Sequence, residues 1–199
     1  MKKKQTFLVV LSVMLSVTTA LAQNPSTNSM KDSRDGQVYE IVKVGSQWWM
    51  AGNLKFDAGS GSWCYDDDPE LCNTFGRLYN WETAKNACPS GWHLPGDKEW
   101  QDLEKALGIS NHLLDQMGWR QFETDLLYAE DKGLKIVMGG YRPHGDGTYD
   151  DGNDDAYFWT STEKDRGDAW KRFLDDQRKQ VGRGYDDKRE GFSVRCVKD

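Results

Sequence analysis

The sequence predicts an α+β fold, in which a few short helices are followed by a group of short strands. Residues 81–88 and 97–107 repeat apolar side chains at helical spacing, whereas residues 134–197 contain five strand-like segments separated by Gly- and Asp-rich turns. Helices and strands do not alternate, which excludes a parallel sheet of βαβ units. We therefore expect short helices packed on an irregular antiparallel β-sheet that disulfides stabilise.

The first 22 residues have the pattern of an export signal peptide. Lysines at positions 2–4 precede an apolar run from Phe7 to Leu21, and Ala20-Leu21-Ala22 provides small side chains for cleavage. The run of about 15 residues is shorter than the roughly 20 that cross a bilayer, so a retained anchor is the less favoured alternative. We expect a mature chain that starts at Gln23 and is periplasmic or extracellular. No cysteine lies near the cleavage point, so the chain is not predicted to be a lipoprotein.

Residues 23–34 are predicted to be a flexible leader, because they are polar and lack a periodic apolar pattern. One domain is expected to span residues 35–199. It begins with a β-branched strand at 38–44 and a second strand at 48–51, which a turn joins into a hairpin. Residues 57–68 are expected to form a loop rich in Gly, Ser and Asp.

The two predicted helices have local signals at their ends. Asn80 is expected to cap the first helix, and Pro89 and Gly91 end it. Asp97 is expected to cap the second helix, and Gly108 to end it. Four tryptophans lie where the pattern predicts core positions: Trp81, Trp92, Trp100 and Trp159.

The charge pattern limits the class of partner. The formal net charge is −6 and becomes −9 once the three N-terminal lysines are removed, which argues against nucleic acid or anionic lipid as partners. Near the C-terminus, basic residues alternate with acidic ones, which predicts a solvated, salt-bridged face. The basic members are Lys171, Arg172, Arg178, Lys179, Arg183, Lys188 and Arg189.

Four cysteines follow the export signal: Cys64, Cys72, Cys88 and Cys196. An even number in an exported chain favours two disulfides, and no Cys-x-x-Cys or Cys/His zinc pattern occurs. Four cysteines allow three pairings. We favour Cys64–Cys72, which closes a small acidic loop, together with Cys88–Cys196, which closes nearly the whole domain.

A series of ordered segments carries a family resemblance. The segments are Asp35-Gly36-x-Val38-Tyr39, Gln47-x-Trp49-Met50-Ala51-x-Asn53-Leu54, Gly76-x-Leu78-Tyr79-Asn80-Trp81, Cys88-Pro89-x-Gly91-Trp92-His93-Leu94-Pro95, Glu99-Trp100, Gly139-Gly140-Tyr141-Arg142, Trp159-x-Ser161-Thr162 and residues 191–197. In these residues the chain resembles the Fibrobacter succinogenes major paralogous domain family over positions 35–199. The resemblance implies a secreted or surface module without a characterised activity.

A more distant resemblance covers about a third of the domain. Trp81-x-x-Ala84-x-x-x-Cys88, followed by Gly91, His93-Leu94 and Glu99, is similar to the first helix and following link of C-type lectin-like domains. In that fold a first-helix cysteine bridges to the last strand. The resemblance therefore implies a C-type lectin-like fold with a Cys88–Cys196 bridge.

No cofactor is predicted, and calcium is the alternative. Calcium takes several oxygen ligands from flexible loops, and one loop is crowded with them. The helix-loop-helix calcium pattern is absent, as are the Glu-Pro-Asn and Trp-Asn-Asp signatures of sugar-binding C-type lectins. The candidate ligands are Asp150, Asp151, Asn153, Asp154 and Asp155.

Aromatic residues near the same loop predict a binding surface. Exposed aromatic faces stack on sugar rings or anchor peptides, and carboxylates beside them add hydrogen-bond acceptors. We expect an exposed rim there that binds a glycan or an envelope protein. Its predicted members are Tyr141, Tyr149, Tyr157, Asp146 and Asp150.

Catalytic residues are not predicted. The chain has no Gly-x-Ser-x-Gly nucleophile motif, and its cysteines are better used as disulfides. We expect a non-catalytic binding module of the bacterial cell envelope. The first alternative is a structural or assembly component of the envelope without a small-molecule ligand. A hydrolase, or an oxidase of the formylglycine-generating type, ranks behind both.

Overall fold

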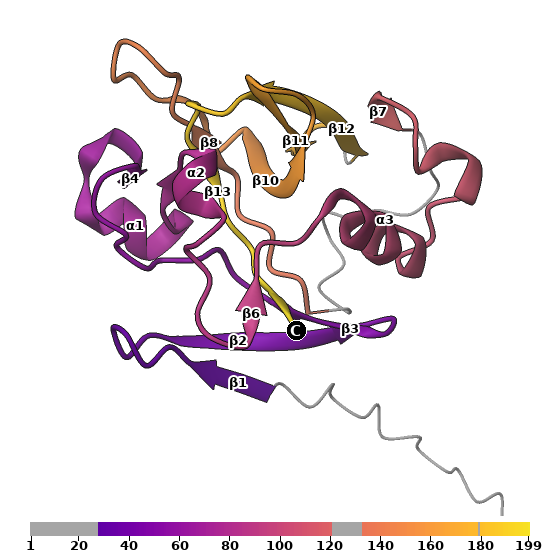
Figure 1. The fold of residues 1–199 in the computed structure, drawn as a ribbon, viewed down its shortest axis with the longest axis horizontal. Helices are drawn as coiled ribbons and strands as arrows, with labels where there is room; N and C mark the ends of the chain where they lie inside the picture. Colours follow the sequence, from indigo (N-terminus) through magenta and orange to yellow (C-terminus); the bar gives the residue numbers. More distant parts are fainter. Residues whose placement is uncertain (1–27, 121–132, 179) are drawn as a thin grey trace, which may run out of the picture.

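The computed structural model describes residues 28–120, 133–178 and 180–199. In these ranges the chain forms two β-sheets, with short helices packed between and beside them (Figure 1). The smaller sheet contains five strands in the order β1 (Asn28–Lys31), β2 (Val38–Val44), β3 (Gln47–Met50), β14 (Val197–Lys198) and β6 (Trp92–His93). The N-terminal hairpin and the end of the chain therefore lie side by side.

The larger sheet is built around three long strands. β10 (Asp155–Glu163), β11 (Asp168–Asp175) and β12 (Gln180–Asp187) run antiparallel, each beside the next. On the other side of β10, both β13 (Phe192–Ser193) and β8 (Gly139–Tyr141) run parallel to it, so the sheet is mixed rather than antiparallel throughout. The remaining strands are β7 (Gly118–Arg120), β4 (Ser62–Trp63), β5 (Leu78–Tyr79) and β9 (Asp150–Gly152).

The helices are short: α1 (Pro69–Phe75), α2 (Trp81–Ala84) and α3 (Asp97–Ala106), with 3₁₀ turns η1 (Tyr65–Asp67) and η2 (Asn111–Leu113). The fold is therefore mostly β-sheet, more β-rich than the predicted α+β class. The first predicted helix ends after one turn, because the chain turns beyond Ala84 and brings Cys88 to Cys196. The lectin-like arrangement stays a prediction.

The helix ends confirm one predicted cap and correct the other. The Asn80 side chain accepts a hydrogen bond from the Thr83 N–H at 2.9 Å, which confirms that cap. Asp97 is not the cap of α3: Gly96 is, and Glu99 accepts its N–H at 2.8 Å. Helix α1 was not predicted, although it starts with Pro69 directly after Asp68, a typical N-cap.

Regular structure begins earlier than expected. Within the predicted flexible leader, Asn28–Lys31 pairs with the edge of β2, and Met30 packs against the core. Asp32 is fully buried and accepts hydrogen bonds from Arg34. Unpaired hydrogen-bonding groups on the edge of β2 explain why a polar segment can form a strand there. The predicted signal peptide and the first residues of the leader lie outside the described residues.

Both predicted disulfides are present. Cys64 pairs with Cys72, and Cys88 pairs with Cys196. The second bridge lies in a buried cluster with Trp81 and Trp159. Trp100 belongs to a separate cluster around α3, so three of the four predicted core tryptophans are buried, and Trp92 is partly buried. Within the described ranges, no helix is long and apolar enough to cross a membrane.

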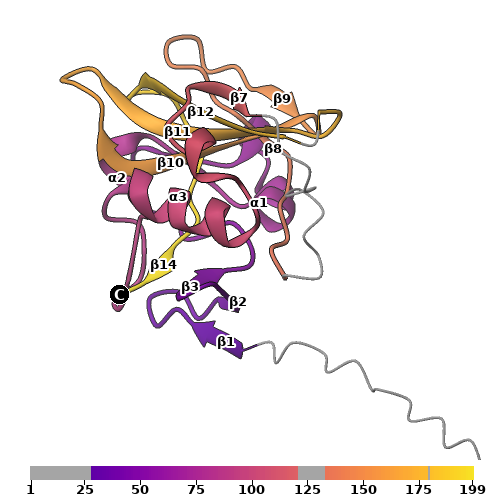
Figure 2. The same ribbon diagram turned by 90° about the vertical axis from the view of Figure 1, so that its right-hand side faces the viewer.

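A buried ion network joins α3 to the larger sheet, and α3 lies beneath that sheet (Figure 2). Glu104 of α3 accepts two hydrogen bonds from Arg120 at 2.6 and 2.7 Å, and one from Arg172 at 2.6 Å. Asp97 accepts from Arg172 and from Arg183, each at 2.7 Å. Burial would raise the pKa of Asp97, but the hydrogen bonds from Arg183 and Arg172 outweigh it and lower that pKa.

This network corrects the predicted solvated face. Arg172 is fully buried and Arg183 is 7% exposed. They face α3 because every second residue of β11 and β12 points to that side. Arg178 and Arg189, by contrast, are exposed and pair with Asp175 and Asp187 as expected. Lys179 lies outside the described residues.

Candidate ligand-binding site

The face of the larger sheet opposite α3, called the outer face here, carries a row of aromatic side chains. Tyr157 on β10 is the register partner of Phe173 on β11. Phe173 is in turn opposite Gly182 on β12, and Gly182 is opposite Trp119 on β7. Register partners point to the same face of a sheet. The strand pairing therefore places three rings in one line across four strands.

Gly182 leaves the space in which the rings of Phe173 and Trp119 come into contact. A Cβ at position 182 would lie 2.1 Å from Cε2 of Phe173, so only glycine leaves room for the Phe173 ring above β12. The ring reaches Trp119 across that gap, with centroids 4.6 Å apart and planes at 77°. A glycine inside a strand often marks such a close approach.

The row lies in a groove of about 420 Å³. Its volume is within the range of small-ligand sites, which are mostly apolar with a few polar groups. The groove is lined by Met117, Gly118, Trp119, Tyr157, Lys171, Phe173, Arg183, Gly184 and Tyr185. Further along the same face Trp159 and Phe192 are fully buried, so the open part of the face is near β7.

The cations that line the groove are already paired. Lys171 lies 2.7 Å from Asp186, and its Nζ is also 4.7 Å from the ring centre of Tyr157. Arg183 contributes to the lining, but its guanidinium lies on the α3 side of the sheet and pairs with Asp97 at 2.7 Å. Because each positive charge has a carboxylate partner, the groove presents little net charge, which favours an uncharged ligand.

The predicted rim meets the groove at Tyr157. Its hydroxyl donates to Asp151 at 2.8 Å and lies 2.9 Å from Asp155. Burial and these two carboxylates raise the pKa of Tyr157, while burial also raises the pKa of Asp155. Tyr141 packs on Tyr157 with centroids 4.9 Å apart, and burial together with Asp150 and Asp151 raises its pKa to about 12. Both tyrosines are half-buried rather than exposed.

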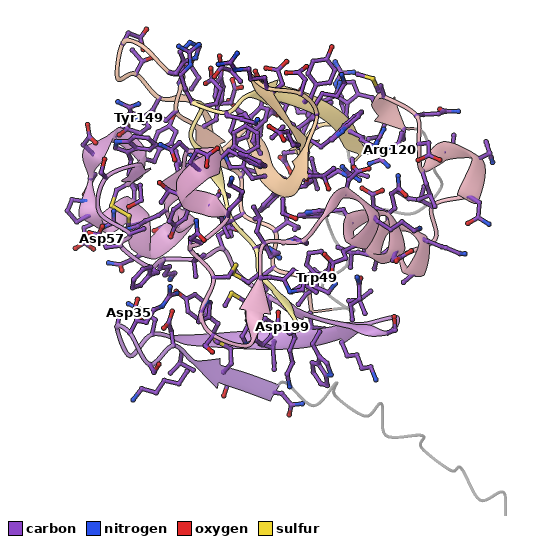
Figure 3. The ribbon with its side chains drawn as sticks, viewed as in Figure 1. Asp35, Trp49, Asp57, Arg120, Tyr149 and Asp199 are labelled. Carbon is purple, nitrogen blue, oxygen red and sulfur yellow. A yellow bond between two sulfur atoms is a disulfide. The ribbon has the colours of Figure 1, made fainter. Side chains whose placement is uncertain are left out.

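The other predicted rim residues lie elsewhere. Tyr149 donates to Asp67 at 2.6 Å and packs on Tyr65, so it lies against the loop that the first disulfide closes. Figure 3 shows it at the opposite end of the larger sheet from Arg120. Asp146 is exposed and accepts hydrogen bonds from Thr148 in its own loop. Asp150 is exposed on β9.

The structure does not gather the calcium candidates into a metal site. In the described part of the chain, no group of three or more His, Cys, Asp or Glu side chains is placed to hold an ion. Asp151 and Asn153 have positive φ angles of 58° and 68°, and Asp151 and Asp155 are bridged by the Tyr157 hydroxyl. The carboxylates of Asp151 and Asp155 are therefore hydrogen-bonded within the protein.

Two histidines are held by carboxylates away from the groove. His93 Nδ1 lies 2.6 Å from Asp199 and Nε2 lies 2.9 Å from Glu99. Burial lowers the pKa of His93, but the hydrogen bonds with Asp199 and Glu99 outweigh it and raise that pKa. His144 Nδ1 lies 2.5 Å from Glu190. His93 links the C-terminal Asp199 to Glu99 of α3, and His144 links its own loop to Glu190, which precedes β13.

Sequence reasoning missed most of the groove. Trp119 and Phe173 were not singled out, and Lys171 was assigned to a solvated face. The available signal was Gly182-Arg183-Gly184, two glycines on one face of a predicted strand, because such spacing leaves room above the backbone. Phe173 lies opposite this gap only in the observed register.

Comparison with known families now adds to this geometry. The model of the Fibrobacter succinogenes major domain matches residues 42–198. The chain belongs to this family. Comparisons with curated proteins and with solved structures give no match. The Fibrobacter succinogenes major domain thus extends here from the first hairpin to the last strand, and it includes all the strands that build the groove.

Proposed function

We propose that this protein is an exported, non-catalytic binding module that recognises a glycan through the groove on the outer face. The observation that carries the proposal is the row formed by Tyr157, Phe173 and Trp119. Aromatic rings offer apolar faces to the C–H groups of sugars, and hydroxyl-bearing neighbours supply hydrogen bonds. The paired cations leave the groove nearly neutral, which suits an uncharged sugar.

Export is supported by the two disulfides, which persist in oxidising compartments outside the cytosol. The proposal includes binding without a cofactor, and calcium is not part of it. A chelator such as EDTA is therefore expected to leave glycan binding unchanged. Loss of binding on chelation, restored by calcium, would instead support the acidic loop as a ligand site.

The test is a glycan array probed with the folded, disulfide-bonded chain, followed by titration calorimetry of the strongest neutral hit. Trp119→Ala is expected to weaken that binding at least about tenfold, because it removes one of the three aromatic rings that form the row. Tyr149→Ala is the matched control, since Tyr149 packs on Tyr65 away from the groove. It should bind like the wild type.

The second candidate is a structural component of the envelope. Binding to no glycan on the array, together with a stable envelope complex recovered by cross-linking, would favour it. Equal binding by wild type and Trp119→Ala would also remove the groove from the proposed function. Thermal unfolding of each variant must show that the fold is kept.

A further inference from the structure

The aromatic row extends beyond the groove to a fourth ring. Gly140 on β8 is the register partner of Ala156 on β10, so the next residues, Tyr141 and Tyr157, are neighbours on the outer face. Their ring centroids are 4.9 Å apart. The row therefore runs Tyr141, Tyr157, Phe173, Trp119, with Gly182 beneath the last gap. It crosses β8, β10, β11, β12 and β7.

The length of this row exceeds one sugar ring. Neighbouring strands are about 4.8 Å apart, so four intervals between five strands span about 19 Å. A monosaccharide could touch one or two of the rings, whereas a chain lying across the strands could touch all four. From this row we infer that the proposed glycan is a neutral linear polysaccharide, bound as an extended chain that crosses the strands of the larger sheet.

The angles between the ring planes indicate whether a crystalline or a soluble polysaccharide fits the row. Tyr141 and Tyr157 are inclined by 56°, and Phe173 and Trp119 by 77°. Because the rings are not coplanar, they cannot all lie flat on the planar surface of a crystalline polysaccharide. A single soluble chain can twist from one ring to the next. The inference is thus for soluble single chains.

Charge complementarity supports an uncharged chain. The row contains no ionised side chain. Two cations lie over its rings, Lys171 over Tyr157 and Arg178 over Trp119, and they are paired with Asp186 at 2.7 Å and with Asp175 at 2.9 Å. Binding that depends on stacking rather than on ion pairs should change little with salt, because screening acts on charges. An anionic polysaccharide would lose affinity steeply as salt is added.

The inference rests on the proposed function, and its test is the dependence of affinity on chain length. The probes are di-, tetra- and hexasaccharides of β-1,4-linked glucose, mannose and N-acetylglucosamine, measured by titration calorimetry at low and high salt. At least one series is expected to bind at least about tenfold more tightly as hexasaccharide than as disaccharide, since the longer chain can contact more of the four rings.

Two variants locate the extra contacts. Tyr141→Ala is expected to weaken hexasaccharide binding about 3- to 10-fold and to leave disaccharide binding unchanged, because the disaccharide can occupy the groove alone. Tyr149→Ala is the control, another half-buried tyrosine of the same region that lies off the row. It should leave both affinities unchanged.

The outcomes separate the two proposals. A short glycan that binds through Trp119 with no gain from added sugars, or with no effect of Tyr141→Ala on the hexasaccharide, overturns the polysaccharide inference and leaves the proposed function standing. Steep loss of affinity with salt, or retention only on insoluble polysaccharide in a pelleting assay, also overturns it. Binding of none of the three series overturns it as well, and a blank glycan array removes the proposed function with it.

Discussion

The two faces of the larger sheet come from the same strands but have opposite chemistry. Toward α3, Arg120, Arg172 and Arg183 are buried and joined to Glu104 and Asp97. On the outer face, the adjacent residues form an open row of aromatic rings over glycine. Alternation along each strand separates the two sets, because successive side chains point to opposite faces.

The comparison shows that one face of the sheet can stabilise the fold while the other face stays available for binding a ligand. The buried arginines and carboxylates on the α3 face are hydrogen-bonded to one another, so removing one of them leaves a buried charge unpaired. The outer face has apolar groups in contact with solvent, and a change there costs packing rather than ion pairing. We therefore expect large stability effects on one face, and combined stability and binding effects on the other.

The largest expected effect is on the α3 face. Glu104→Gln should lower the free energy of unfolding by about 3–5 kcal/mol, because it leaves Arg120 and Arg172 buried without their shared carboxylate. Asp102→Asn on the same helix is the control: it breaks an exposed pair with Lys98 and should cost less than about 1 kcal/mol. Urea denaturation measures both. Similar small losses in the two variants would show that the network does not stabilise the fold.

A smaller effect is expected from the glycine beneath the row. Gly182→Ala places a Cβ against the Phe173 ring, which must move, so we expect a loss of about 1–3 kcal/mol and weaker glycan binding. Gly184→Ala is the matched control, since its closest contact with Phe173 would be 3.2 Å. Urea denaturation and calorimetry report the two effects. If Gly182→Ala behaves like Gly184→Ala in both, Phe173 does not need the space above β12.

The smallest expected effect is a change in acid stability that depends on the ion pairs of the α3 face. The folded-state pKa of Asp97 lies below its ordinary value of 3.8, so its ion pairs contribute fully above that pH and are lost as the pH falls through the lowered pKa. Asp97→Asn should therefore lose less stability than the wild type when the pH is lowered below 3.8. Asp102→Asn should follow the wild type. Parallel acid curves for wild type and Asp97→Asn would contradict the assignment.

Much of the fold could be predicted from local pattern. The strand at 38–44, the cap at Asn80 and the helix that contains Trp100 and Leu103 all depend on neighbours within a few positions. The short helix α1 was not predicted because it lies beside a loop rich in acidic residues. The strand β1 was not predicted because it forms only by pairing with the edge of β2. The division of Phe192–Val197 into two strands in different sheets was missed for a similar reason: it depends on partners far away in the chain.

The candidate site was predicted only in part. Tyr141, Tyr149 and Tyr157 were predicted as rim residues because they flank one acidic loop, and the structure brings Tyr141 and Tyr157 into contact. Tyr149 was grouped with them by proximity in the chain, but its hydroxyl turns to Asp67 instead. Trp119 joins the site from a strand far away in sequence, so only the strand pairing reveals it.

By itself the sequence determined the family, favoured the observed pairing of its four cysteines and located the longer strands, because each of these depends on residue types and spacing along the chain. The tertiary structure decided which face of each strand is buried and which rings share a row. That choice depends on register, since a shift by one residue would exchange Phe173 with Arg172 and place the charged network where the groove now lies.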